Sequence, residues 1–344
     1  MQLKSKFLIG CGLTLLILLS VEQPALAEWS VEGEGNIFYT DDVAIFSATR
    51  RLTLREDPTQ PVIDVTGQGE DAVFEPLLSL SRSFQPSWGV IELSARAQGF
   101  VFAQNPVFNH GTYGLQATQE LPSNALLGFR YHYGPNLFLG DNEDRRAEDE
   151  SLAEERVTTH FWVAEVERRV MENLNLRVLG RYGLRFYNEA FAQRDTRFWT
   201  IGSHLEWEVL SWIELMLGYH YERGLADGRN EPELRDDISY VNNYVLVELD
   251  IDLTDRTSLR FGFDYERNDF TSGIPEDIHR DGYENIFQGD VEIRHAFTPS
   301  MDIAVGYQRG QRKFSFEPST EFVNNVWVGL EGRFDFEVGT QANN

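Results

Sequence analysis

The sequence has one cysteine, Cys11, among 344 residues, which excludes a disulfide scaffold or a cysteine-based metal site. It is also short of positive charge: 30 Lys and Arg stand against 55 Asp and Glu, a formal charge of −25. Nucleic-acid-binding proteins are usually basic, so no nucleic-acid partner is expected. Aromatic residues make up 13% of the chain, whereas a disordered acidic chain would contain few. The composition therefore predicts a folded protein, with either two soluble domains or one large β domain.

The first 27 residues have the three parts of a secretory signal peptide. Lys4 and Lys6 form a basic start, residues 7–19 form an apolar run, and Ala25-Leu26-Ala27 is a small-residue exit. The apolar run is shorter than the roughly 20 residues that a membrane anchor needs. We therefore expect cleavage after Ala27.

A lipoprotein is the alternative for this segment, because Leu8-Ile9-Gly10-Cys11 resembles a lipidation box. Its position argues against lipidation, since most of the apolar residues follow the cysteine. Signal-peptide cleavage would also remove Cys11. After Ala27 no run of 18 apolar residues occurs, so no transmembrane helix is expected.

The remaining chain alternates between apolar and polar or small residues. In segment 300–308, Met301, Ile303, Val305 and Tyr307 alternate with such residues, and segments 212–222 and 258–266 repeat the pattern. A period of two is typical of β-strands, and runs of nine or more residues match tilted strands that cross a bilayer. We place fourteen strands at 29–40, 73–84, 88–103, 112–121, 124–136, 157–170, 174–188, 197–209, 212–223, 239–253, 257–268, 284–297, 300–313 and 322–336.

The connections between these runs alternate in length. The short connections lie at 85–87, 122–123, 171–173, 210–211, 254–256 and 298–299, and the long ones at 41–72, 104–111, 137–156, 189–196, 224–238, 269–283 and 314–321. This rhythm is typical of outer-membrane barrels, which have short periplasmic turns and long external loops. The sequence therefore predicts an all-β fold, a transmembrane antiparallel up-and-down β-barrel over residues 28–336. We expect about 14 strands, although the pattern also allows 12 or 16, and a short tail follows at 337–344.

Aromatic residues near the strand ends give independent support. Membrane barrels carry aromatic girdles at both interfaces, whereas a soluble β-sandwich would not concentrate aromatics at strand ends. The candidate girdle residues are Trp29, Trp88, Trp162, Trp199, Trp207, Trp212, Phe334 and Phe336. A closed barrel pairs every backbone polar group between strands, so it needs neither disulfides nor helices. Outward-facing apolar residues also explain a mean hydropathy of −0.36 in a membrane protein.

Two stretches resemble a known family. The stretch from Asn36 to Val43, Asn-Ile-Phe-Tyr-Thr-Asp-Asp-Val, is similar to the Tyr-x-Asp-Asn-Val opening of a group of Gram-negative outer-membrane β-barrel porins. The stretch from Phe74 to Leu80 resembles the second strand of that group. The resemblance implies a barrel with a transport role, and partners comprising outer-membrane lipid and lipopolysaccharide, periplasmic chaperones and the barrel assembly machinery. Such barrels usually end on an aromatic residue, whereas here eight residues follow Phe336.

Charged residues alternate with the apolar face, so we expect them to line the lumen. The candidates for the lumen and its constriction are Arg177, Arg181, Arg185, Glu165, Glu167, His204, Glu206, Arg260, Asp264, Asp290 and Arg294. A basic stripe beside carboxylates could create a transverse field that filters polar solutes. The alternative is that cross-strand ion pairs fill a polar interior and fix the register. Carboxylates outnumber arginines on this face, which favours cations.

The sequence shows no catalytic, metal or cofactor site. The acidic segment 137–156 lacks the EF-hand spacing and is expected to be a solvated loop. Walker, His-Glu-x-x-His and Gly-x-Ser-x-Gly motifs are absent from the sequence. His110, His160 and His279, with Ser151 and Asp277 nearby, form no recognisable catalytic arrangement and are expected to be loop residues. His132 and His220 are expected to be polar lumen residues.

Two classes of function follow. The first is a monomeric outer-membrane channel for passive diffusion of ions or small polar solutes, which is not an enzyme. The second is a non-conducting barrel, either a structural or surface-display protein or a hydrolase with its site at the rim. Single-channel recording separates these classes, but the sequence does not name a solute.

Overall fold

The computed structural model describes residues 28–54, 69–86, 89–147 and 151–337 of the chain. The signal peptide expected at 1–27, most of the expected tail at 337–344, and Trp88 lie outside the described residues. Within them the secondary structure comprises β1 (Glu28–Thr40), α2 (Val43–Thr53), β2 (Asp71–Phe84), β3 (Ile91–Phe102), η1 (Pro106–Phe108), β4 (His110–Leu121), β5 (Ala125–Glu143), β6 (Leu152–Met171), β7 (Leu174–Tyr187), η2 (Glu189–Arg194), β8 (Thr196–Leu210), β9 (Ile213–Ala226), η3 (Asp227–Asn230), η4 (Pro232–Leu234), β10 (Tyr240–Thr254), β11 (Thr257–Phe270), β12 (Tyr283–Thr298), β13 (Met301–Phe314) and β14 (Glu321–Glu337).

The fourteen strands form a closed antiparallel barrel in which each strand pairs with its neighbours in sequence. Closure occurs between the first and last strands: Trp29 of β1 faces Phe336 of β14 on one side and Arg82 of β2 on the other. Closing the sheet leaves no free strand edge. The predicted all-β barrel of about 14 strands is therefore confirmed, with most strand ends within three residues of their expected positions.

The period of two sorts the side chains between the two faces of the wall. In β8, Thr196, Phe198 and Thr200 are buried, whereas Trp199 and Ile201 are exposed. Large apolar side chains are exposed in the same way on the other strands, for example Leu78 and Val305. An apolar outer face around a polar interior is the arrangement of barrels that stand in lipid.

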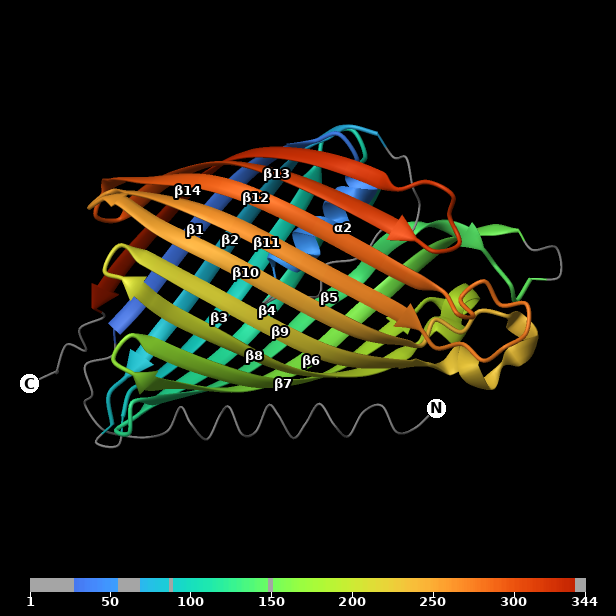
Figure 1. Cartoon of the computed structure of the whole chain (residues 1–344), viewed down its shortest axis with the longest axis horizontal. Coiled ribbons are helices and arrows are strands. Elements are labelled where there is room, and N and C mark those ends of the chain that lie inside the picture. The colour runs from blue at the N-terminus through green and yellow to red at the C-terminus, as the bar shows by residue number, and fades with distance from the viewer. Residues whose placement is uncertain (1–27, 55–68, 87–88, 148–150, 338–344) are drawn as a thin grey trace, which may run out of the picture.

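The two ends of the barrel differ. Short turns such as 172–173 and 255–256 gather at one end, on the left in Figure 1, which we call the turn side. The longer connections, with the short helices η2, η3 and η4, gather at the other end, which we call the loop side. Among the described residues, no helix is both long and apolar enough to span a membrane.

The expectation of a solvated loop at 137–156 is wrong for most of that segment. β5 continues to Glu143 and β6 begins at Leu152, so the two strands extend as a paired hairpin beyond the expected ends. The pairing shifts register between Gly134 and Leu137, and Leu137, Leu139 and Val157 then form a buried cluster. This register shift interrupts the alternation of apolar and polar residues along β5. Together with the acidic residues that follow, it made the outer part of the hairpin resemble a loop in the sequence.

The expected long loop at 41–72 contains an α-helix, although the barrel argument required none. Asp42 caps α2: its Oδ1 accepts hydrogen bonds from the backbone N–H groups of Ala44 (2.9 Å) and Ile45 (3.1 Å). Every residue from Val43 to Ala48 is buried. An 11-residue helix that is buried on all sides of its first turns must be surrounded by protein, and Figure 1 shows it inside the barrel.

Candidate channel lumen and constriction

The α2 segment is anchored where β1 leaves the barrel wall. The Asp41 carboxylate accepts hydrogen bonds from the backbone N–H and the side-chain amide of Asn324, both at 2.7 Å. Val43 N–H donates to the Gly69 carbonyl at 3.1 Å. Both ends of the inserted segment are therefore fixed at the loop side, and the helix enters the lumen from there.

Inside the lumen, α2 joins two apolar clusters on different parts of the wall. Its first half, with Phe46, packs against strands β1, β2, β3 and β5 in the cluster Phe38, Val43, Ala44, Phe46, Val73, Phe100, Phe102, Phe108 and Phe138. Its second half packs against β10 and β12 in the cluster Ala48, Leu52, Tyr244, Leu246 and Ile286. The helix therefore bridges the barrel interior and narrows the loop-side half of the lumen.

Two consecutive arginines tie α2 to the wall in different directions. Arg50 Nε donates to Glu75 Oε2 of β2 at 2.8 Å, and Arg51 forms an ion pair with Glu266 of β11. The exposed fractions of Glu75 and Glu266 are only 1% and 3%. Buried carboxylates need such partners, because an unpaired charge in a low-dielectric interior is costly.

Polar contacts complete the attachment at the end of the helix. Thr53 Oγ1 accepts hydrogen bonds from Gln288 (3.0 Å) and Gln308 (3.2 Å), and Tyr244 donates to the Leu52 carbonyl at 3.2 Å. Sequence reasoning missed Arg50 and Arg51 as lumen residues. The signals for them were present, because an N-cap aspartate precedes an apolar stretch with two arginines in its last turn.

A cavity of about 480 Å³ lies beside α2 and extends along the acidic wall. The helix contributes Arg50 and Thr53 to its lining, and its C-cap residue contributes Leu54. The strands contribute seven carboxylates, Glu34, Glu214, Glu248, Asp250, Asp264, Asp290 and Glu292, and three further arginines, Arg96, Arg260 and Arg294.

Several of these wall charges are paired with one another. Arg260 binds Asp250 at 3.0 Å, and Arg294 binds Glu331 and, at 3.3 Å, Glu292. Gln288 donates to Asp264 at 2.7 Å. The Arg260–Asp250 contact joins the neighbouring strands β10 and β11, and the Gln288–Asp264 contact joins β11 and β12. That such contacts fix the strand register stays a prediction.

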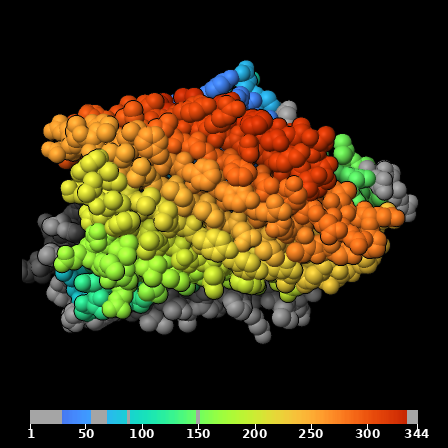
Figure 2. Space-filling view, viewed as in Figure 1, coloured from blue at the N-terminus to red at the C-terminus, as the bar shows by residue number. Residues whose placement is uncertain are grey.

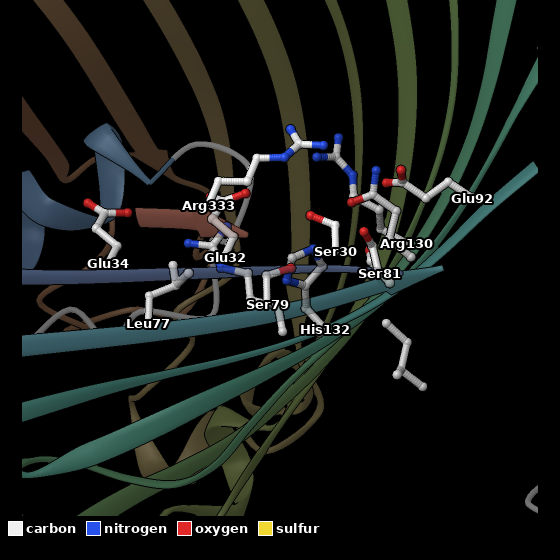
Figure 3. A pocket seen from close by; sticks show the side chains of 15 residues that line it. Ser30, Glu32, Glu34, Leu77, Ser79, Ser81, Glu92, Arg130, His132 and Arg333 are labelled. Carbon is white, nitrogen blue, oxygen red and sulfur yellow. The ribbon is translucent and has the colours of Figure 1, made fainter. Parts of the chain in front are cut away.

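A second cavity, of about 290 Å³, lies toward the turn side against β1 to β5 and β14. Figure 3 shows Arg130 and Arg333 reaching into it above Ser30, Ser79 and Ser81. Its lining is mostly polar and includes Glu32, Glu34, Glu92 and His132. The turn-side half of the lumen is therefore hollow where the loop-side half is packed.

The predicted basic stripe lies on β7. Arg177 binds Glu206 at 2.8 Å and Glu167 at 3.5 Å. Nearer the loop side, Arg181 and Arg185 both approach Glu222, at 3.8 and 3.9 Å. A small cavity of about 40 Å³ separates them from Arg51 and Leu52 of α2.

The remaining candidates lie beside this stripe rather than in one ring. Arg130 of β5 binds Glu165 at 2.6 Å, and the Nε2 atoms of His204 and His220 are 2.7 Å apart. The structure therefore brings the candidates together as an acidic wall on β9 to β14 and a mixed arginine–carboxylate wall on β5 to β9. Whether either wall selects solutes stays a prediction.

The outward aromatic residues gather near both ends of the wall. On the loop side Trp162 and Trp199 neighbour Tyr182 and Tyr221, and on the turn side Trp207, Trp212 and Phe334 are exposed. Arg82 lies over the Trp29 ring at 5.1 Å. Trp88 and the side chain of Phe336 lie outside the described residues.

The expected loop positions fail for two histidines. His160 lies within β6, where its Nδ1 is 2.8 Å from the Tyr131 hydroxyl, and it therefore joins the outward aromatic residues. His110 is the first residue of β4 and stacks on Phe100. For His160 the loop expectation conflicted with the strand placed at 157–170, which contains it. His110 lies two residues before the strand placed at 112–121, where the alternation did not separate strand from loop.

His279 does lie in a loop, between β11 and β12, where it contacts Asp277 and stands near Ser272. Its Nδ1 is 2.9 Å from Asp277 Oδ1, and Ser272 Oγ donates to Asp277 Oδ2 at 2.7 Å. Burial raises the pKa of Asp277, but hydrogen bonds from His279, Ser272 and backbone N–H groups outweigh it and lower the pKa to about 2. The serine is directed at the aspartate instead of the histidine, so the trio lacks the nucleophile–base contact of a hydrolase.

In the described part of the chain, no group of three or more His, Cys, Asp or Glu residues is arranged to hold a metal ion. Neither a protein-family model nor a curated protein matches the sequence.

Solved structures show what the fold is similar to. The outer membrane channel DcaP of Acinetobacter baumannii matches with a TM-score of 0.53 and 8% identity, over 91% of this chain and 99% of that chain. The anion-selective porin from Comamonas acidovorans matches with a TM-score of 0.46 and 8% identity, over 90% and 99% of the two chains. At this identity the first match shows the fold alone, and the second is too weak to support an argument. The expected likeness to outer-membrane porin barrels is confirmed at the level of the fold.

Proposed function

We propose that the protein is an outer-membrane channel for the passive diffusion of ions and small polar solutes, with a preference for cations. The observation that carries the proposal is a closed barrel with an apolar outer face and a hollow, charged lumen. A structural barrel could fill its interior completely, whereas this one keeps a cavity of about 480 Å³ beside the narrowing helix α2 and another of about 290 Å³ toward the turn side.

The cation preference is supported by the charges around the larger cavity. Seven carboxylates and four arginines line it, so their formal charges sum to a negative value. A negative potential in a narrow, low-dielectric passage concentrates cations and excludes anions. α2 adds Arg50 to this lining, so the helix sets both the width and the local charge of the passage.

Recording from single channels in a planar bilayer tests the proposal. We expect stable current steps and, in a salt gradient, a reversal potential of the sign for cation preference. Neutralising the acidic wall with Asp290→Asn and Glu248→Gln should move the reversal potential toward zero. Glu233→Gln, which removes one negative charge from the exposed helix η4, is the control and should leave it unchanged. A reversal potential of the anion sign in the unmodified protein would refute the preference.

A non-conducting barrel is the second candidate, and one observation favours it: α2 contacts opposite parts of the wall and packs the loop-side half of the lumen. In that case the protein should migrate as a heat-modifiable, folded barrel on a gel and yet give no current steps. Folded but silent protein would support a structural or surface-display role and overturn the channel.

A further inference from the structure

Inward side chains of β9 to β14 stand in rows around the barrel, because each strand pairs residue by residue with the next. The first row, with one residue from each strand in order, comprises Glu214, Asp250, Arg260, Glu292, Gly306 and Trp327. The second row, two residues nearer the loop side on each strand, comprises Met216, Glu248, Gly262, Asp290, Gln308 and Asn325. Neighbouring strands are about 4.8 Å apart, so the residues of one row lie side by side. Most of both rows lines the cavity of about 480 Å³ beside α2.

Trp327 is a tryptophan on the inner face of the wall, and a glycine makes room for it. A Cβ added at Gly306 of β13 would collide with the Trp327 ring, so the indole crosses β13 where the wall carries no side chain. Its Nε1 donates to Glu292 Oε2 on β12 at 2.9 Å. The indole therefore lies along the wall next to the carboxylates of β12 and forms part of the cavity lining.

Asp290 lies against a second glycine and has no paired charge. A Cβ added at Gly262 of β11 would collide with its carboxylate, so this side chain also extends across the neighbouring strand. Arg260 pairs with Asp250 at 3.0 Å and with Glu248 at 3.7 Å. In the described part of the chain, Asp290 and Glu214 form neither a hydrogen bond nor an ion pair. Carboxylates crowded around one cavity repel one another, and a cation between them relieves that repulsion.

Two buried hydrogen-bond acceptors adjoin the same cavity. Gln288 Oε1 and Asn325 Oδ1 are buried, and no donor among the described residues reaches either oxygen. The two residues are only 2% and 1% exposed. Their amide nitrogens donate to two residues of the cavity lining, Asp264 and Gln308, each at 2.7 Å. A buried carbonyl oxygen without a donor costs free energy, so this part of the wall favours a ligand that brings N–H groups.

The cavity also has an apolar side. Besides Trp327 its lining includes Phe38, whose ring centre is 5.7 Å from that of Trp327, and the side chains of Met216 and Leu246. A cation within about 6 Å of an aromatic ring is attracted to the ring face, most strongly for tryptophan. The strands that carry the two rows form the yellow to red face of Figure 2, which is continuous on the outside, so a solute reaches the cavity along the lumen.

We propose that this cavity binds primary ammonium ions that carry an apolar group, and that these ions are the solute class of the channel. A primary ammonium group offers three N–H donors, no acceptor and one positive charge, which matches the carboxylates of Asp290 and Glu214 and the two buried acceptors. The apolar group of the solute contacts Trp327 and Phe38. An inorganic cation uses the carboxylates alone. The inference rests on the proposed function, because it names the solute class of the same lumen.

Calorimetric titration of 2-phenylethylammonium into the full-length protein in neutral detergent micelles tests the inference, with titration into protein-free micelles subtracted. We expect saturable binding. 2-Phenylethanol has the same shape without the charge and should bind about tenfold more weakly or worse. Benzyltrimethylammonium keeps the ring and the charge but has no N–H donor, and it should also bind more weakly. If either analogue binds as tightly as 2-phenylethylammonium, the inference is wrong.

Variants with matched controls locate the binding. Trp327→Leu and Asp290→Asn should each weaken the binding of 2-phenylethylammonium about fivefold or more, because the first removes the ring and the second removes the charge. Trp199→Leu is the control for the ring, since Trp199 is 45% exposed on the outer face of the barrel. Glu92→Gln is the control for the charge, since Glu92 lines the other cavity, toward the turn side. Equal losses in the controls would contradict the inference.

Two further measurements complete the test. Potassium ions at the same concentration as 2-phenylethylammonium should not displace it; displacement would mean that the wall attracts any cation, and would overturn the inference. If Trp327→Leu does not fold by gel migration, Asp290→Asn decides the question, and unchanged affinity in the folded Asp290→Asn variant would overturn the inference. The channel is tested separately: a protein that binds the ammonium ion without conducting refutes the channel alone, and one that conducts without binding it refutes this inference alone.

Discussion

The two halves of the lumen are built from the same alternating strands, but their interiors differ. On the loop side, α2 fills the space with Phe46, Leu52 and the wall residues around them, and its charges are buried in pairs. On the turn side, the interior is polar and hollow, and Arg260 keeps 42% of its side chain exposed. The strand pattern therefore fixes which side chains point inward but not whether the space between them is filled.

This difference separates two tasks within one barrel. The loop-side half has the packing of a soluble core, so changes there should alter stability and pore size. The turn-side half has water-accessible charges, so changes there should alter ion preference with little effect on folding. Each prediction below compares one change in the packed half with a matched change elsewhere.

The largest effect is expected from removing the helix. Replacing residues 43–68 by a short Gly/Ser linker should raise single-channel conductance severalfold, because the loop-side half would become as open as the turn-side half. The barrel should still fold, since its strands close without α2. Shortening the β5–β6 hairpin at 144–151, whose described residues have no part in the cluster around α2, is the control. Unchanged conductance after removal of the helix would show that α2 is not the constriction.

Truncating a core residue of the packed half should cost stability. Phe46→Ala removes a side chain that is 2% exposed, and we expect a loss of about 3–5 kcal/mol in the free energy of unfolding. Ser79→Ala, in the lining of the turn-side cavity, should change it by no more than about 0.5 kcal/mol. Urea unfolding in lipid vesicles measures both. Equal losses would mean that the two halves are packed alike.

Breaking an ion pair should show the same contrast. Arg51→Met leaves Glu266 buried without this partner and should cost about 3 kcal/mol, most of which Glu266→Gln in the same chain should restore. Arg260→Met on the turn side should cost less than about 1 kcal/mol, because the pair with Asp250 is half exposed. A double-mutant cycle measures the two coupling energies. A larger coupling energy for Arg260–Asp250 than for Arg51–Glu266 would contradict the expected difference between the two halves.

The smallest effect is expected in the loops above the packed half. Hydrogen bonds lower the pKa of Asp277 to about 2 from an ordinary value of 3.8, so its stabilising contribution is complete above about pH 4 and is lost as the pH falls toward 2. Hydrogen exchange of amides in segment 271–282 should therefore accelerate over that range. Amides of the turn at 211–212 serve as the reference. In the Asp277→Asn variant, hydrogen exchange of segment 271–282 should no longer accelerate between about pH 4 and pH 2. If the acceleration persists in this variant, another titrating group causes it.

Much of this structure was predictable because strand pairing is a local rule. The alternation of Leu259, Phe261 and Phe263 with Arg260 and Asp264 determined both the strand and the face of each side chain. The rule failed where pairing is irregular: the register shift after Gly134 hid the outer part of the β5–β6 hairpin. It also failed at His110, which the alternation left in the connection at 104–111 and which is the first residue of β4.

The amino-acid sequence by itself determined an antiparallel barrel of about fourteen strands and its charged inward positions, because these follow from residues two apart and from neighbouring strands. Only the tertiary structure decided that α2 lies inside the lumen. Its contacts join residues far apart in the chain, such as Arg51 and Glu266, separated by 215 positions. The same helix, with its apolar and basic residues, could equally have lain on an outer surface. The closed barrel provides the one place where its apolar sides and both arginines find partners at once.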